Sequence, residues 1–171
     1  MSPDPDFSRW RPGQMPYAGS DQLRAEVALN MIHAGVSEAN NLDVAMTICV
    51  VDVGAQLMSL HRMSDAMAFS VDLAYGKAQT AVRTKQPTHV WQRWFRDGGP
   101  THGVLFPPGF VSVAGGFPLV RDNVVVGGLG VSGAQWEDLA VAAACISAGG
   151  FSDADVAPVL ARARSRVGHE Q

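Results

Sequence analysis

Residues 115–133 read GGFPLVRDNVVVGGLGVSG, two apolar runs separated by a short polar segment. The runs Pro118–Val120 and Val124–Val131 are typical of strands, and Arg121-Asp122-Asn123 between them is typical of a tight turn. Just upstream, Phe110–Ala114 has the composition of a further strand. The pattern therefore predicts neighbouring antiparallel strands at this point of the chain.

Outward from this stretch, two more strands precede it and helices lie on either side. Val44–Val53 is β-branched and apolar, so it is expected to be buried on both faces, and Gln56–Met63 returns beside it after a turn. The order favours an α+β fold, a single domain with about five antiparallel strands flanked by helices, which we expect to cover one side of the sheet. The expected helices are one capped by Ser20 that runs to about Asn40, one capped by Ser70, a short one carrying Trp91, Trp94 and Phe95, Gln135–Ala148 and Asp153–Val167.

Composition restricts the class of protein. The chain has 171 residues, of which 47% are hydrophobic and 17% charged, with a formal net charge of −3, and no basic run suggests nucleic-acid binding. Residues 1–19 form a Pro-rich arm whose aromatic residues favour packing on a neighbouring subunit as much as a disordered tail, and residues 20–171 form the domain. With neither a signal peptide nor a membrane span in the pattern, we expect a cytoplasmic protein.

The glycine run Gly128–Gly133 spells G-x-G-x-x-G and nearly spells a nucleophile elbow around Ser132. A dinucleotide site needs a second strand after the helix, and a serine hydrolase needs Asp and His partners later in the chain. Neither follows here. We expect instead that the glycines let a helix or a ligand approach the sheet closely, and that Ser132 caps the next helix.

Individual polar residues suggest a site. His102 lies in a loop rich in glycine and proline, and functional residues are common in such loops. His102 is therefore a candidate to contact a ligand, to act as an acid or base, or to lie next to a haem. Lys77 shares a helix face with small residues, so its ammonium either extends to the edge or enters a pocket where burial lowers its pKa. Arg62 ends a strand, where it could clamp a carboxylate or stay solvated. No histidine or cysteine spacing predicts a metal site, and Cys49 and Cys145 are expected to be buried.

Several segments together resemble one known family, in the family's order, over about residues 20–150. They are His61–Ala66, Ser70–Asp72, Lys77–Ala81, Gly98-Gly99-Pro100, Gly115–Leu119, and Val126–Gly133 followed by Asp138. The family is GlcG/HbpS-like and includes the C-terminal domain of the cobalamin adenosyltransferase PduO. This resemblance implies a small antiparallel sheet flanked by helices, assembled as dimers or larger homo-oligomers, with haem-binding or haem-degrading members.

The resemblance also implies a place for the pocket. It would lie near the G-G-x-P-L strand and the lysine helix, with Arg62 and Asp138 nearby. Where the family often carries a bulky residue after G-G-P, this chain reads Thr101-His102-Gly103-Val104. The Pro-rich arm is a second departure from the family pattern, and both favour a specialised ligand. The implied ligand-binding residues are Arg62, Gly115, Gly116, Phe117 and Pro118, and the candidate catalytic residues are His102, Lys77 and Asp138.

Three hypotheses follow. The first is a small-ligand-binding protein that binds haem or another tetrapyrrole, with or without degrading it, and has His102 as a candidate axial ligand. The second is a cofactor-independent lyase, isomerase or hydrolase acting on a small carboxylate or carbonyl compound, in which Arg62 or Lys77 binds the anion and His102 moves a proton. The third is a non-catalytic protein that stabilises a partner enzyme. The sequence leaves open whether the protein is an enzyme.

Overall fold

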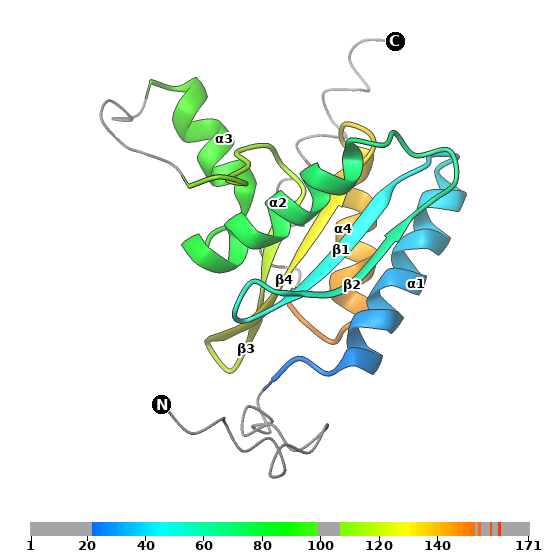
Figure 1. Cartoon of the computed structure of the whole chain (residues 1–171), viewed down its shortest axis with the longest axis horizontal. Helices are drawn as coiled ribbons and strands as arrows, with labels where there is room; N and C mark the ends of the chain where they lie inside the picture. The colour runs from blue at the N-terminus through cyan, green and yellow to red at the C-terminus, as the bar shows by residue number, and fades with distance from the viewer. Residues whose placement is uncertain (1–21, 99–106, 153, 155–157, 159–160, 162–171) are drawn as a thin grey trace, which may run out of the picture.

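A four-stranded antiparallel sheet forms the centre of the chain in a computed structural model that describes residues 22–98, 107–152, 154, 158 and 161 (Figure 1). The strand order is β2-β1-β4-β3, and every neighbouring pair is antiparallel. This confirms the α+β class. The elements are α1 (Ala25–Asn41), β1 (Thr47–Asp52), β2 (Leu57–Arg62), α2 (Ser70–Thr84), α3 (Thr88–Arg96), β3 (Gly116–Arg121), β4 (Val124–Ser132) and α4 (Glu137–Ala148).

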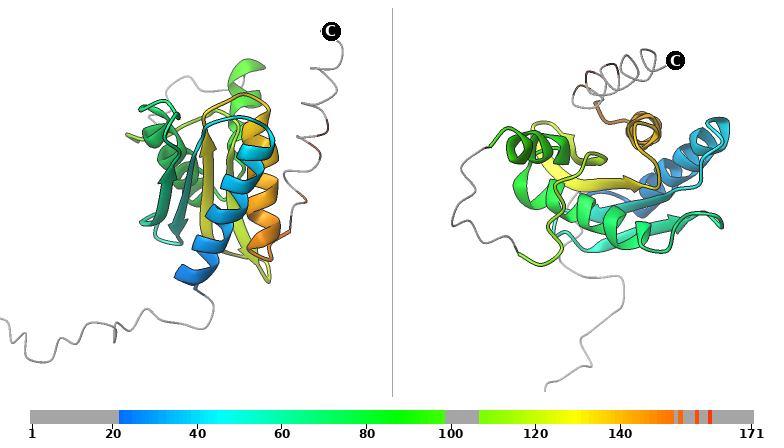
Figure 2. Two further views of the ribbon diagram at one scale, coloured as in Figure 1. Left: turned by 90° about the vertical axis from the view of Figure 1, so that its right-hand side faces the viewer. Right: turned by 90° about the horizontal axis from the view of Figure 1, so that it is seen from above.

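Helices cover both faces of the sheet. Figure 2 shows α1 and α4 on one face and α2 on the other. Side chains alternate between the faces along β1, so that Ile48 and Val50 join the core under α1 and α4 while Cys49 and Val51 join the smaller core under α2. The expectation of helices on one side only was therefore wrong, whereas the predicted burial of β1 on both faces is confirmed.

The close packing of α2 on the sheet depends on glycines in β4. Leu129 and Val131 point toward α1 and α4, so Gly128 and Gly130 present their Cα atoms to α2. A Cβ at Gly128 would lie 2.7 Å from the backbone oxygen of Ala78, and one at Gly130 would collide with the backbone oxygen of Ala74. The prediction that these glycines admit a helix at close range is confirmed.

The described residues contain one strand fewer than expected, because Phe110–Ala114 is not a strand. Two of its backbone N–H groups bond to side chains instead of a neighbouring strand: Val111 donates to Oγ1 of Thr80 at 2.9 Å and Ala114 donates to Oε1 of Gln92 at 3.2 Å. Polar side chains of α2 and α3 thus accept hydrogen bonds that a neighbouring strand would accept in a sheet.

Two predicted helix caps were also wrong. Ser70 is the first residue of α2 and bonds to Thr47 at 2.7 Å, and Ser132 is the last residue of β4, with α4 beginning only at Glu137. The arm at residues 1–19 lies outside the described residues, as does most of the expected helix over residues 153–167. Among the described helices, none has the length and hydropathy needed to cross a membrane.

Candidate functional site

Two of the residues implied by the sequence, Lys77 and Asp138, form a buried ion pair. Lys77 of α2 is 1% exposed and Asp138 of α4 is 3% exposed. The Lys77 ammonium lies 2.8 Å from Oδ2 of Asp138 and donates a second hydrogen bond of 2.7 Å to the backbone oxygen of Val131. Lys77 therefore points inward rather than along the surface.

This ion pair joins the two helical layers. Lys77 belongs to the helix on one face of the sheet, whereas Asp138 belongs to the first turn of the helix on the other face (Figure 1). The two side chains meet beside Val131, near the end of β4. The second carboxylate oxygen of Asp138 accepts a 2.9 Å hydrogen bond from the N–H of Ala134. Asp138 therefore also holds the segment that connects β4 to α4.

Two glycines make room for the lysine. Gly115 has φ +114°, a conformation that side chains disfavour, and a Cβ there would lie 2.9 Å from the Lys77 ammonium. At Gly116, a Cβ would lie 2.5 Å from the Lys77 backbone oxygen. Gly115 and Gly116 therefore serve packing around Lys77, which gives the G-G-x-P-L motif a structural reason.

Burial acts on both charges of the pair. Loss of water lowers the pKa of Lys77 and raises the pKa of Asp138, while the attraction between the two groups opposes both shifts. The hydrogen bonds to Val131 and Ala134 further compensate the buried charges. Such a pair is suited to holding elements in register.

Two threonines that sequence reasoning did not single out complete this region. Thr88, fully buried at the start of α3, accepts a 2.9 Å bond from the N–H of Gly116, and Thr80 bonds to Val111 from the α2 side. Thr80 stands inside the Lys77–Ala81 motif, so a signal for it was present. Thr88 was visible only as the residue after Pro87 at the start of a short helix.

The other predicted site residues are more scattered. Arg62 is exposed at the end of β2 and donates a 2.8 Å bond to the backbone oxygen of Ala66. Because β1 lies between β2 and β4, about 10 Å separates the strand of Arg62 from that of Val131. Phe117 is 1% exposed and belongs to the core under α1 and α4, while Pro118 is buried in the edge strand β3. His102 lies outside the described residues.

Aromatic side chains gather where the His102 loop leaves and rejoins the described chain. The Phe110 ring lies 5.6 Å from Trp91 and 6.5 Å from Phe95, both edge to face, and Trp91 stacks on Trp94 at 4.9 Å. These are distances between ring centroids. Phe110 follows the loop and the other three rings precede it on α3, so the loop starts and finishes at one aromatic cluster, which comprises Trp91, Trp94, Phe95 and Phe110.

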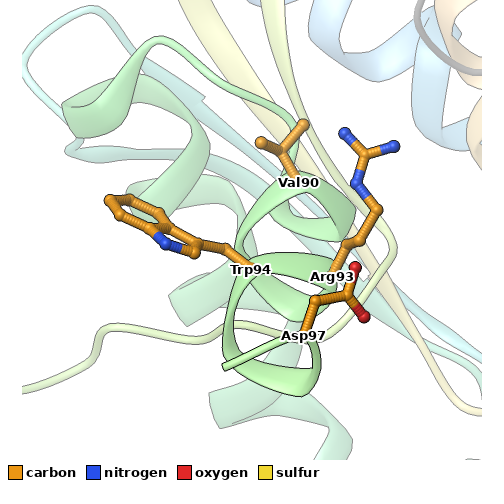
Figure 3. Close-up of a pocket in the computed structure, with 4 residues that line it drawn as sticks. All are labelled: Val90, Arg93, Trp94 and Asp97. Atoms are coloured by element: carbon orange, nitrogen blue, oxygen red, sulfur yellow. The ribbon is translucent and has the colours of Figure 1, made fainter. Parts of the chain in front are cut away.

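Neither of the two best-defined pockets among the described residues is lined by Lys77. The larger, about 320 Å³ and open to solvent, lies on α3 (Figure 3), and the smaller, about 110 Å³, lies between the start of α1 and the β1–β2 turn. Burial raises the pKa of both Cys49 and Cys145 to about 12, so neither thiol is ionised at neutral pH.

Comparison with known proteins agrees with this geometry. The family described as "Haem degrading protein HbpS-like" matches residues 23–147. The corrinoid adenosyltransferase PduO of Salmonella typhimurium is 34% identical over 121 residues, which are 69% of this chain but only 36% of PduO. Protein GlcG of Escherichia coli K12 is 32% identical over 110 residues, covering 64% of this chain and 81% of GlcG.

Solved structures give the same result. A crystal structure of a PduOC:haem complex superposes with a TM-score of 0.70 at 32% identity, covering 74% of this chain and 94% of that one. Crystalline HbpS superposes with a TM-score of 0.65 at 27% identity, covering 81% of this chain and 96% of that one. The chain belongs to the HbpS-like family, as its motifs indicated. It spans about a third of the length of PduO.

Proposed function

We propose that this protein binds haem at the loop that contains His102, against the aromatic cluster of α3. The observation that carries the proposal is the return of the chain to that cluster, since Phe110 packs on Trp91 and Phe95 at ring distances of 5.6 and 6.5 Å. Aromatic faces suit a porphyrin ring, and a loop histidine suits its iron. The likeness to the PduOC:haem complex supports the same ligand.

Within this proposal the residues have different roles. His102 is the candidate iron ligand, and the bound haem would supply the redox and ligand chemistry of its iron. Lys77 and Asp138 position the segment before β3, because Gly115 and Gly116 pack directly on Lys77. Arg62 lies at the same end of the sheet, but its guanidinium bonds to the Ala66 backbone oxygen, so this proposal gives it no contact with haem. The fold would act in the cytoplasm.

The enzyme hypothesis is less well supported by the geometry. It requires the Lys77 ammonium or the Arg62 guanidinium to bind a substrate anion. The ammonium already bonds to Asp138 and to Val131, and the guanidinium bonds to Ala66. Haem binding, which needs neither group to be free, is therefore preferred.

Haem titration followed by absorbance tests the proposal. We expect saturable binding with a Soret band in the wild-type protein, and a shifted and weakened band in His102→Ala because an iron ligand is lost. His61→Ala is the matched control, since His61 is exposed on β2, and it should bind like the wild type. A flat titration of the wild type would refute haem binding, and an unchanged band in His102→Ala would refute the assignment of His102.

A further inference from the structure

Helix α3 has one face that packs and one that does not. Thr88 is the only buried residue of its nine. The helix lies at the margin of the molecule, where it touches only α2 and β3 among the described elements (Figure 1). Trp91 and Phe95 point to the packed side, against Phe110. At 100° per residue, positions 90, 93 and 97 lie on roughly the opposite side, and Trp94 lies at the margin between the two sides, with its ring stacked on Trp91.

These four positions form a hollow with an aromatic and two charged groups. Val90, Arg93, Trp94 and Asp97 line the open pocket of about 320 Å³. In Figure 3, Arg93 and Trp94 project to different sides, with Val90 between them. Trp94 is 39% exposed, yet its ring is held in place by stacking on Trp91 at 4.9 Å. A rigid, exposed tryptophan beside an arginine is typical of the centre of a protein–protein interface.

The charges on this face are complementary to those on the same face of a second copy. Arg93 and Asp97 lie one helical turn apart, so two such helices packed antiparallel about a two-fold axis bring Arg93 of each copy opposite Asp97 of the other. Within the described part of the chain, Arg93 has no acidic partner. Asp97 pairs with Arg96 at 2.9 Å, but both side chains are more than half exposed, so that contact contributes little.

We propose that this outer face of α3, comprising Val90, Arg93, Trp94 and Asp97, docks on the same face of a second copy of the chain. Trp94 of each copy fills the hollow of the other, and two symmetric Arg93–Asp97 pairs fix the antiparallel orientation. Trp94 also belongs to the aromatic cluster that we assign to haem, but Arg93 and Asp97 do not, so reversing these two charges tests the docking surface separately from haem binding.

A charge swap measured by sedimentation and native mass spectrometry tests the surface. The wild type should dimerise at micromolar concentrations. Arg93→Asp and Asp97→Arg should each weaken association at least about tenfold, because like charges then face each other. The double variant Arg93→Asp/Asp97→Arg should restore it, since every pair is rebuilt with its charges exchanged. All these residues are exposed, so circular dichroism should stay unchanged.

Arg96→Asp is the matched control. It reverses a neighbouring exposed charge on the same helix, about 110° away from the centre of the proposed face. It should leave association within about twofold of the wild type. A monomeric wild type, a dimer that neither single reversal weakens, or a double variant that stays as weak as the single variants would each overturn the proposal.

Discussion

Lys77 keeps a charge in the interior because every partner it needs is within reach. Its ammonium has Asp138 at 2.8 Å and the Val131 carbonyl at 2.7 Å, and Gly115 leaves the space that it occupies. Residue-level reasoning predicted that Lys77 would lie at an edge or in a pocket. It could not identify Asp138, 61 positions later, from local pattern alone, and the resemblance to the family supplied that residue.

Removing one charge of this pair should therefore be costly. We expect Lys77→Met to lower the free energy of unfolding by about 3–5 kcal/mol, because the Asp138 carboxylate is left buried without its cation. Urea denaturation measures the loss. Lys77→Met/Asp138→Asn should recover at least half of it, since asparagine keeps an oxygen for the Ala134 N–H and carries no charge. Equal losses in the single and double variants would contradict a charge-based role.

The pH dependence of the single variant gives an independent check. Burial raises the pKa of Asp138, so the folded chain holds this proton at a higher pH than the unfolded chain does. Stability contributed by the protonated form is therefore gained as pH falls and lost as pH rises through the folded pKa. The deficit of Lys77→Met should shrink from neutral pH toward acid. The deficit of Lys77→Met/Asp138→Asn should not change in this way.

The elements could be predicted where the signal is local. All four strands could be predicted from apolar runs and from the turns that separate them. β1 and β4 have compositions typical of strands, and each is joined to another strand by a short turn. Which helices lie on each face of the sheet could not be predicted as well, because this depends on how α1 and α4 pack against each other. The burial of β1 on both faces was nevertheless an argument for two helical layers, and it conflicted with the expectation of one.

Segment 110–114 shows a different limit. Its residues are mostly apolar and compatible with a strand, but Val111 and Ala114 donate their hydrogen bonds to Thr80 on α2 and Gln92 on α3. Composition cannot report which partner a backbone N–H will find in the fold. The same applies to Thr88, whose bond to Gly116 joins α3 to β3.

The contact between α2 and β4 predicts the effect of a single methyl group. Gly130→Ala should lower the free energy of unfolding by at least about 3 kcal/mol, because its Cβ would meet the backbone of Ala74, which cannot rotate away. Gly54→Ala is the control. There the nearest atom to a new Cβ is the Asp52 carboxylate oxygen at 3.2 Å, so the change should stay within about 0.5 kcal/mol. A loss below about 1 kcal/mol at Gly130 would contradict close packing of α2 on β4.

At the scale of the whole molecule, the residues of the candidate site fall into two groups. Lys77, Gly115, Gly130 and Asp138 build the rigid junction between the two helical layers and the sheet. The aromatic cluster of α3 lies beside that junction and is joined to it through Thr88 and Gly116. A rigid junction of this kind lets a neighbouring loop change in sequence without loss of the fold.

Haem binding should consequently stabilise the entire domain rather than the loop alone. A ligand that binds only the folded chain raises the free energy of unfolding by about 2.7 kcal/mol at one hundred times its dissociation constant. Urea denaturation with haem, and separately with iron-free protoporphyrin, separates two contributions to this gain. Protoporphyrin reports the contacts of the ring with the aromatic cluster, and the additional gain with haem reports the iron ligand. In His102→Ala we expect the gain from protoporphyrin to persist and the additional gain from haem to disappear. If haem stabilised the wild type and His102→Ala equally, the iron ligand would be a residue other than His102.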